Sequence, residues 1–75
     1  MITHPRRVAH AHQLITLYGD RIRGFSVRGH HGHRGYTYTL WARLDGGIST
    51  CISTFYSWQD LLAATPTKYH AELSR

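Results

Sequence analysis

The stretch YTYTLWARLDGG, residues 36–47, decides the fold. Within it, Tyr36–Leu44 alternates between a mainly apolar set at even positions and a more polar set at odd positions, and it is rich in aromatic and β-branched residues. A period of two with these residue types predicts a β-strand with one buried and one exposed face. Asp45-Gly46-Gly47 tolerates the positive φ angles of a tight turn, so Ile48–Phe55 is predicted to return as the next strand of a hairpin. The side chains predicted to face the core are those of Tyr36, Tyr38, Leu40, Ala42 and Leu44, and the exposed ones those of Thr37, Thr39, Trp41 and Arg43.

A further strand and a helix precede this hairpin. Ile22–Arg28 predicts a short strand with Phe25 and Val27 on one face. Before it, apolar residues at helical spacing predict a helix over Pro5–Tyr18, and Gly19 supplies a left-handed C-cap.

The last part of the chain is predicted to be helical. Ser57-Trp58-Gln59-Asp60 resembles a capping box with Ser57 as the N-cap, and Trp58 is assigned to the core. Pro66 interrupts this helix, and Tyr69 and Leu73 of the final segment are expected to reach back to the core. The order α-β-β-β-α, with the closing helix broken in two, predicts an α+β fold in which a three-stranded antiparallel sheet carries helices on one face.

The 75 residues predict a single small basic domain, residues 1–75, because a chain of this length builds only one modest core. This length excludes a cofactor-binding fold joined to a substrate domain. The one cysteine, Cys51, has no partner for an internal disulfide, which fits a reducing compartment. No apolar run approaches the roughly 20 residues of a membrane span, and no apolar segment typical of a secretory signal is visible. We therefore expect a cytoplasmic protein without a membrane partner.

Positive charge is concentrated in the first half of the chain. Residues 1–44 hold seven arginines against Asp20, a balance of +6, whereas residues 45–75 carry −1. Eight of the nine cations are arginines, whose guanidinium groups bind phosphate through two hydrogen bonds and stack on flat rings. This pattern indicates an anionic partner, and a merely solvated arginine-rich face is the alternative.

Trp41 beside Arg43 on the exposed strand face predicts a flat cationic platform of the kind that single-stranded nucleic-acid binders use. The alternative is that Trp41 caps a sheet edge.

The segment Arg28–Gly35, RGHHGHRG, is predicted to be a loop. Its glycine N–H groups, with Arg28 and Arg34, favour an anion-binding concavity that contacts phosphate. His31 and His33 raise the question of a metal ion, but no cysteine pair or helical His-x3-His pattern accompanies them. Neither a metal nor a cofactor is therefore predicted, and a flexible solvated loop is the other alternative.

The order of elements resembles the double-stranded-RNA-binding domain, a family that has a histidine-containing loop between its first two strands. Gly29–Gly35 stands at that place, and Tyr38–Gly46 is similar to the family's second strand and turn. The resemblance implies an RNA-binding fold over most of the chain.

Small ribonuclease toxins of the HicA type share that fold. Their first strand begins Gly-Phe and leads through an arginine to a catalytic histidine, and Gly24-Phe25-Ser26-Val27-Arg28-Gly29-His30-His31 is similar in order. This resemblance implies a metal-independent ribonuclease in which His31 is the catalytic residue. Such a histidine deprotonates a ribose 2′-hydroxyl while arginines stabilise the phosphorane.

We predict a small non-enzymatic module that binds nucleic acid or a nucleoprotein complex. The alternatives are an anti-CRISPR-like phage or mobile-element inhibitor that binds a host protein or nucleoprotein machine, and the ribonuclease toxin. Homodimerisation through a sheet edge also stays open. The predicted nucleic-acid contacts are Arg28, His30, His31, His33, Arg34, Trp41 and Arg43, extended by Arg6, Arg7, Arg21 and Arg23.

Overall fold

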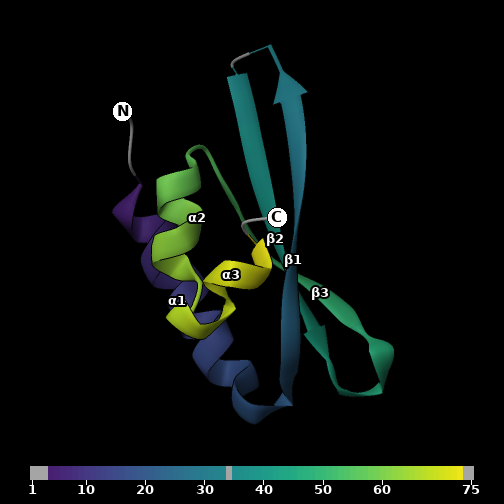
Figure 1. Ribbon diagram of the computed structural model, residues 1–75. Coiled ribbons are helices and arrows are strands. Elements are labelled where there is room, and N and C mark those ends of the chain that lie inside the picture. Colours follow the sequence, from purple (N-terminus) through teal and green to yellow (C-terminus); the bar gives the residue numbers. More distant parts are fainter. Residues whose placement is uncertain (1–3, 34, 74–75) are drawn as a thin grey trace.

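The computed structural model describes residues 4–33 and 35–73 and has the predicted α+β architecture. One antiparallel sheet of three strands carries all the helices on one side (Figure 1). The elements are α1 (Pro5–Tyr18), a 3₁₀ turn (Gly19–Arg21), β1 (Ile22–Gly32), β2 (Gly35–Leu44), a 3₁₀ turn (Asp45–Gly47), β3 (Ser49–Phe55), α2 (Trp58–Ala64), a 3₁₀ turn (Thr67–Tyr69) and α3 (His70–Leu73).

The central strand β2 buries the predicted apolar set along most of its length. Leu40 and Ala42 are fully buried, and Leu44 is nearly so. Phe25 on β1 lies opposite Ala42, and Phe55 on β3 lies opposite Tyr38. The helices close the core with small and branched side chains, namely Ala11, Leu61 and Ala64. The core therefore occupies one face of the sheet, and the other face has no covering element among the described residues.

β3 departs from simple alternation because of a register shift. A strict period of two places Ile52 and Phe55 on opposite faces, yet both are buried. The pairing of β2 with β3 is irregular between Leu40 and Trp41, so one extra residue of β3 is accommodated there. A bulge of this kind reverses the facing of the residues that follow it.

The helix signals in the sequence are mostly confirmed. Ser57 Oγ accepts a hydrogen bond from the Asp60 backbone N–H at 3.1 Å, which is the predicted cap of α2. Tyr69 and Leu73 pack on the core, and Trp58 packs against its margin. Gly19 has the expected positive φ of 53°, but its ψ of −124° lies outside the left-handed helical region.

Two histidines hold the helical layer together at the end of α2. His12 Nε2 lies 2.9 Å from the Ala63 carbonyl oxygen, and His70 Nε2 lies 2.9 Å and 2.8 Å from those of Leu62 and Thr65. A carbonyl oxygen only accepts, so Nε2 carries the proton in both rings. The bond from His12 pairs the Ala63 carbonyl in the last turn of α2, where helix carbonyl groups lack an intrahelical partner.

The prediction of a loop over Arg28–Gly35 is wrong. β1 and β2 stay paired as far as Gly32 and Gly35, so residues 28–32 belong to a strand and the hairpin projects beyond the helices (Figure 1). The three glycines suggested a loop, but Gly29 lies in a strand, where its lack of a side chain leaves space for a neighbouring ring. Tyr36 lies across Gly29, where an added Cβ would stand 2.3 Å from its hydroxyl oxygen.

The exposure of Tyr36 is a second correction. Its side chain is 48% exposed instead of buried, because the helices do not extend over this part of the hairpin. Its ring packs at 5.1 Å from that of Tyr38, which in turn meets Trp58 edge-on at 5.3 Å. A row of ring contacts thus joins Tyr36 and Tyr38 of the hairpin to Trp58 of α2.

Replacing Gly29 should destabilise the protein because a methyl group would displace the Tyr36 ring. We expect Gly29→Ala to lower the free energy of unfolding by about 1 kcal/mol relative to Gly32→Ala, the size of one aromatic contact. Gly32 is the matched control, since an added Cβ there has no neighbour closer than 3.8 Å. Urea denaturation measures both, and equal stabilities would show that the Tyr36 contact contributes nothing.

Candidate nucleic-acid interface

Four of the predicted contact residues share the uncovered face of the sheet. In the antiparallel pairing, Arg28 is opposite Thr39 and His30 is opposite Thr37. Residues opposite one another point to the same side, and Trp41 and Arg43 follow at intervals of two along β2. We call the set Arg28, His30, Trp41 and Arg43 the outer-face cluster.

Trp41 lies at the centre of this cluster. It is on the middle strand, so the alternative that it caps a sheet edge is wrong. Its cross-strand neighbours, Ser26 on β1 and Cys51 on β3, are both small and exposed, and Trp41 itself is half-buried. The indole Nε1 is buried without a hydrogen-bond partner in the described part of the chain. Packing, not a hydrogen bond, therefore holds the ring.

The cation that covers Trp41 is Arg28. Its guanidinium carbon lies 5.8 Å from the centre of the indole ring, within the range of a cation–π contact. The sequence suggested Arg43 for this role because it is two residues away on the same strand. Arg28 comes instead from the neighbouring strand, through a register that extends into the segment predicted to be a loop.

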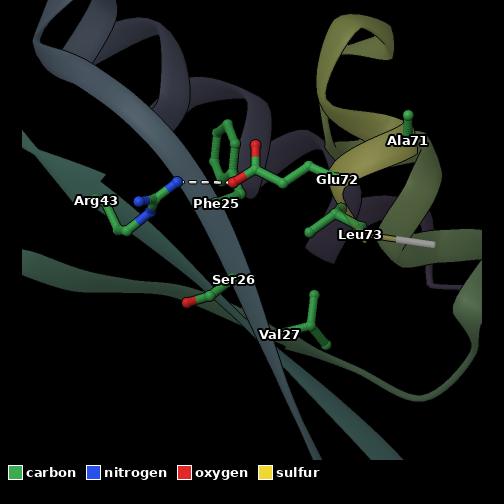
Figure 2. A pocket seen from close by; sticks show the side chains of 7 residues that line it. All are labelled: Phe25, Ser26, Val27, Arg43, Ala71, Glu72 and Leu73. Atoms are coloured by element: carbon green, nitrogen blue, oxygen red, sulfur yellow. Dashed lines mark hydrogen bonds and ion pairs between the residues drawn. The ribbon is translucent and has the colours of Figure 1, made fainter. Parts of the chain in front are cut away.

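Arg43 points away from Trp41 towards α3. Its guanidinium passes over Gly24, where an added Cβ would lie 2.1 Å from one nitrogen, and donates a hydrogen bond to Glu72 Oε1 at 2.7 Å. Figure 2 shows this contact at an open groove lined by β1 residues 25–27 and α3. Glu72 and Gly24 were not predicted, because neither has a sequence signal that links it to Arg43.

The histidines of the hairpin are divided between its two faces. His31 pairs with Tyr36 in the sheet and lies on the helix side, with its ring 6.2 Å from that of Tyr36. His33 is exposed in the turn. Arg34 lies outside the described residues. The predicted histidine cluster is therefore not one surface, and only His30 belongs to the outer-face cluster.

The additional arginines occupy several separate places. Arg7 on α1 donates to the Thr54 carbonyl oxygen at 3.1 Å and lies 4.9 Å from the centre of the Tyr56 ring. Arg23 forms an ion pair with Asp45. Arg6 on α1 and Arg21 in the first 3₁₀ turn are exposed. Arg6 and Arg7 thus belong to the helical layer, and the cluster does not include them.

Across residues 4–33 and 35–73, no group of three His, Cys, Asp or Glu side chains is placed to hold a metal ion. In the same residues, no helix has the length and apolar character needed to cross a membrane. What the outer face offers chemically is an indole surface, guanidinium and imidazole donors, and a row of threonine hydroxyls.

Comparisons with known proteins do not assign this chain to a class or a family. A scan against protein-family models, a search of curated proteins and a search of solved structures each gave no match. The candidate site accordingly rests on its own geometry.

The contact between Arg28 and Trp41 has a spectroscopic consequence. In a Trp58→Phe background, Trp41 is the only tryptophan, and Arg28→Ala should raise the quenching of its fluorescence by acrylamide because the covering guanidinium is gone. Lys68→Ala is the charge-matched control, since Lys68 lies over Tyr69 instead. Equal quenching in the two variants would place Arg28 away from the ring.

Proposed function

We propose that this protein binds single-stranded nucleic acid on the outer face of its sheet and acts as a binding module instead of an enzyme. The observation that carries this proposal is the Arg28 guanidinium held over the Trp41 ring on a face that none of the described helices covers. An indole and a guanidinium both stack on nucleobases, and the guanidinium also neutralises phosphate.

The neighbours of Trp41 favour a single strand over a duplex. Ser26 and Cys51 leave room for a planar base beside the ring, and a base stacks on an aromatic side chain only when its own face is exposed. In a duplex the base faces are already stacked on one another. His30 supplies a further side-chain donor along the same face, whereas the Thr37 hydroxyl already donates to the His30 carbonyl oxygen and the Thr39 and Thr54 hydroxyls bond to each other.

The binding experiment uses labelled oligonucleotides of about 10 bases, within the site sizes that small binding domains occupy. Fluorescence anisotropy with single-stranded RNA, single-stranded DNA and duplexes, at about 50 and 200 mM salt, should show affinity for single strands that falls with salt. Absence of binding to every oligonucleotide would overturn the proposal and favour the protein-partner inhibitor. A gel of the same samples tests the ribonuclease alternative, which requires cleavage that is lost in His31→Ala.

Two variants separate stacking from charge. Trp41→Leu should weaken binding by about 1–3 kcal/mol with little change in salt dependence, because it removes a stacking surface. Arg28→Ala should weaken binding and reduce the slope of log affinity against log salt by about 0.7, one phosphate contact on a single strand. Lys68→Ala, which removes the same charge from the helical layer, should leave the affinity close to that of the wild type. If all three variants bind alike, the site lies elsewhere.

The reactivity of Cys51 reports whether an oligonucleotide covers the same face. It is the single cysteine of the chain, it is exposed, and it pairs with Trp41 across the sheet. Bound oligonucleotide should therefore slow the reaction of Cys51 with iodoacetamide, as followed by mass spectrometry. An unchanged rate at saturating oligonucleotide would show that the strand does not cross this face.

A further inference from the structure

The contact between Arg43 and Glu72 joins the outer face of the sheet to the last helix. The side chains are 53% and 37% exposed, respectively, and the nitrogen–oxygen distance is 2.7 Å. The guanidinium reaches Glu72 because β1 has a glycine at the position opposite Arg43, so the side chain crosses the strand unhindered (Figure 2). Any side chain at position 24 would meet the Arg43 guanidinium.

The segment that carries Glu72 has contacts with the rest of the protein besides this ion pair. The segment that carries it is held by Tyr69, whose ring packs edge-on against Phe25 at 4.8 Å. His70 holds the same segment to the end of α2 through its contacts with the Leu62 and Thr65 carbonyl groups. α3 therefore places the Glu72 carboxylate beside Arg43. The contacts of Tyr69 and His70 remain when the Arg43–Glu72 ion pair is broken.

Arg43 is also correctly spaced to receive the backbone of a strand that stacks on Trp41. Residues two apart on one face of a strand are separated by about 7 Å, roughly the distance between neighbouring phosphates in an extended strand. Arg28 covers Trp41 from the β1 side, and Arg43 lies one step further along β2. A base stacked beside the indole would thus have the Arg28 guanidinium next to it and Arg43 near the adjoining phosphate.

We infer that Arg43 is a phosphate subsite of the outer face, and that in the free protein the Glu72 carboxylate occupies the place of the phosphate. This inference rests on the proposed function. Carboxylate and phosphodiester oxygens are both anions that a guanidinium binds through short, charge-assisted hydrogen bonds. The ion pair is solvent-exposed, so its replacement by a phosphate costs little. Glu72 then lowers affinity and selects against anions too weak to displace it.

A second ion pair supplies a matched control. Arg23 and Asp45 are also exposed, with side chains 65% and 49% accessible, but they lie at the start of β1 and in the turn that follows β2. Glu72→Gln and Asp45→Asn each remove one negative charge from an arginine partner, and only the first frees Arg43. A difference in affinity between the two variants therefore depends on where the charge was removed, since the change in net charge is the same.

The experiment measures the binding of a single-stranded oligouridine of about 10 bases to the full chain by fluorescence anisotropy. Glu72→Gln should bind about two- to five-fold more tightly than Asp45→Asn at low salt, the range set by breaking an exposed ion pair. Arg43→Ala in the Glu72→Gln background should abolish this gain. Glu72→Asp, which retains the charge but shortens the side chain, should produce part of the gain. It also serves as the second variant if Glu72→Gln unfolds in the accompanying urea titration.

The possible results test the phosphate subsite and the proposed function separately. Equal affinities of Glu72→Gln and Asp45→Asn, with the wild type still binding, would overturn the phosphate subsite and leave the proposed function standing. A gain that survives Arg43→Ala would also overturn the subsite. Failure of the wild type and every variant to bind would overturn the proposed function itself.

Discussion

The pairing of β2 on both sides is the constraint on which the rest of the structure depends. Its backbone groups bond to β1 along one edge and to β3 along the other, so only its two side-chain faces remain to be covered. The helical segments all lie on one of these faces (Figure 1). The helices of residues 4–33 and 35–73 close a single core on that face, and none of them covers the second face. The side chains of the second face therefore decide what it can bind.

Local patterns in the sequence were sufficient for most of the fold. The alternation around Leu40 and Ala42 predicted the central strand and its buried face, and α1 has the predicted bounds Pro5–Tyr18. The cap at Ser57 and the break at Pro66 depend on neighbouring residues only, so they too were predicted correctly. The bulge in β3 was not, because it reflects the need to bury both Ile52 and Phe55, which is a property of the assembled core.

The hairpin shows why the candidate site was only partly predictable. The glycines and histidines of residues 28–35 have the composition of a loop, yet strand pairing continues through them. Once these residues are in a strand, their alternation places His30 and His31 on opposite faces of the sheet. The amino-acid composition of the segment could not predict this separation. The cover that Arg28 provides for Trp41 depends on the same register. Trp41 itself was placed correctly on the uncovered face because its own strand has a clear alternation.

The positions of the acidic side chains show which arginines already have a carboxylate partner. Asp45 pairs with Arg23 and Glu72 with Arg43, while Asp60 accepts a hydrogen bond from the His4 backbone N–H at 2.8 Å and so joins the beginnings of α1 and α2. Of these three carboxylates, only Asp60 is buried, whereas Asp45 and Glu72 lie in exposed ion pairs. Arg28 contacts the Trp41 ring and forms no ion pair within residues 4–33 and 35–73, and a ring contact does not neutralise its charge. Arg28 thus brings a positive charge and a flat ring together on the outer face of the sheet.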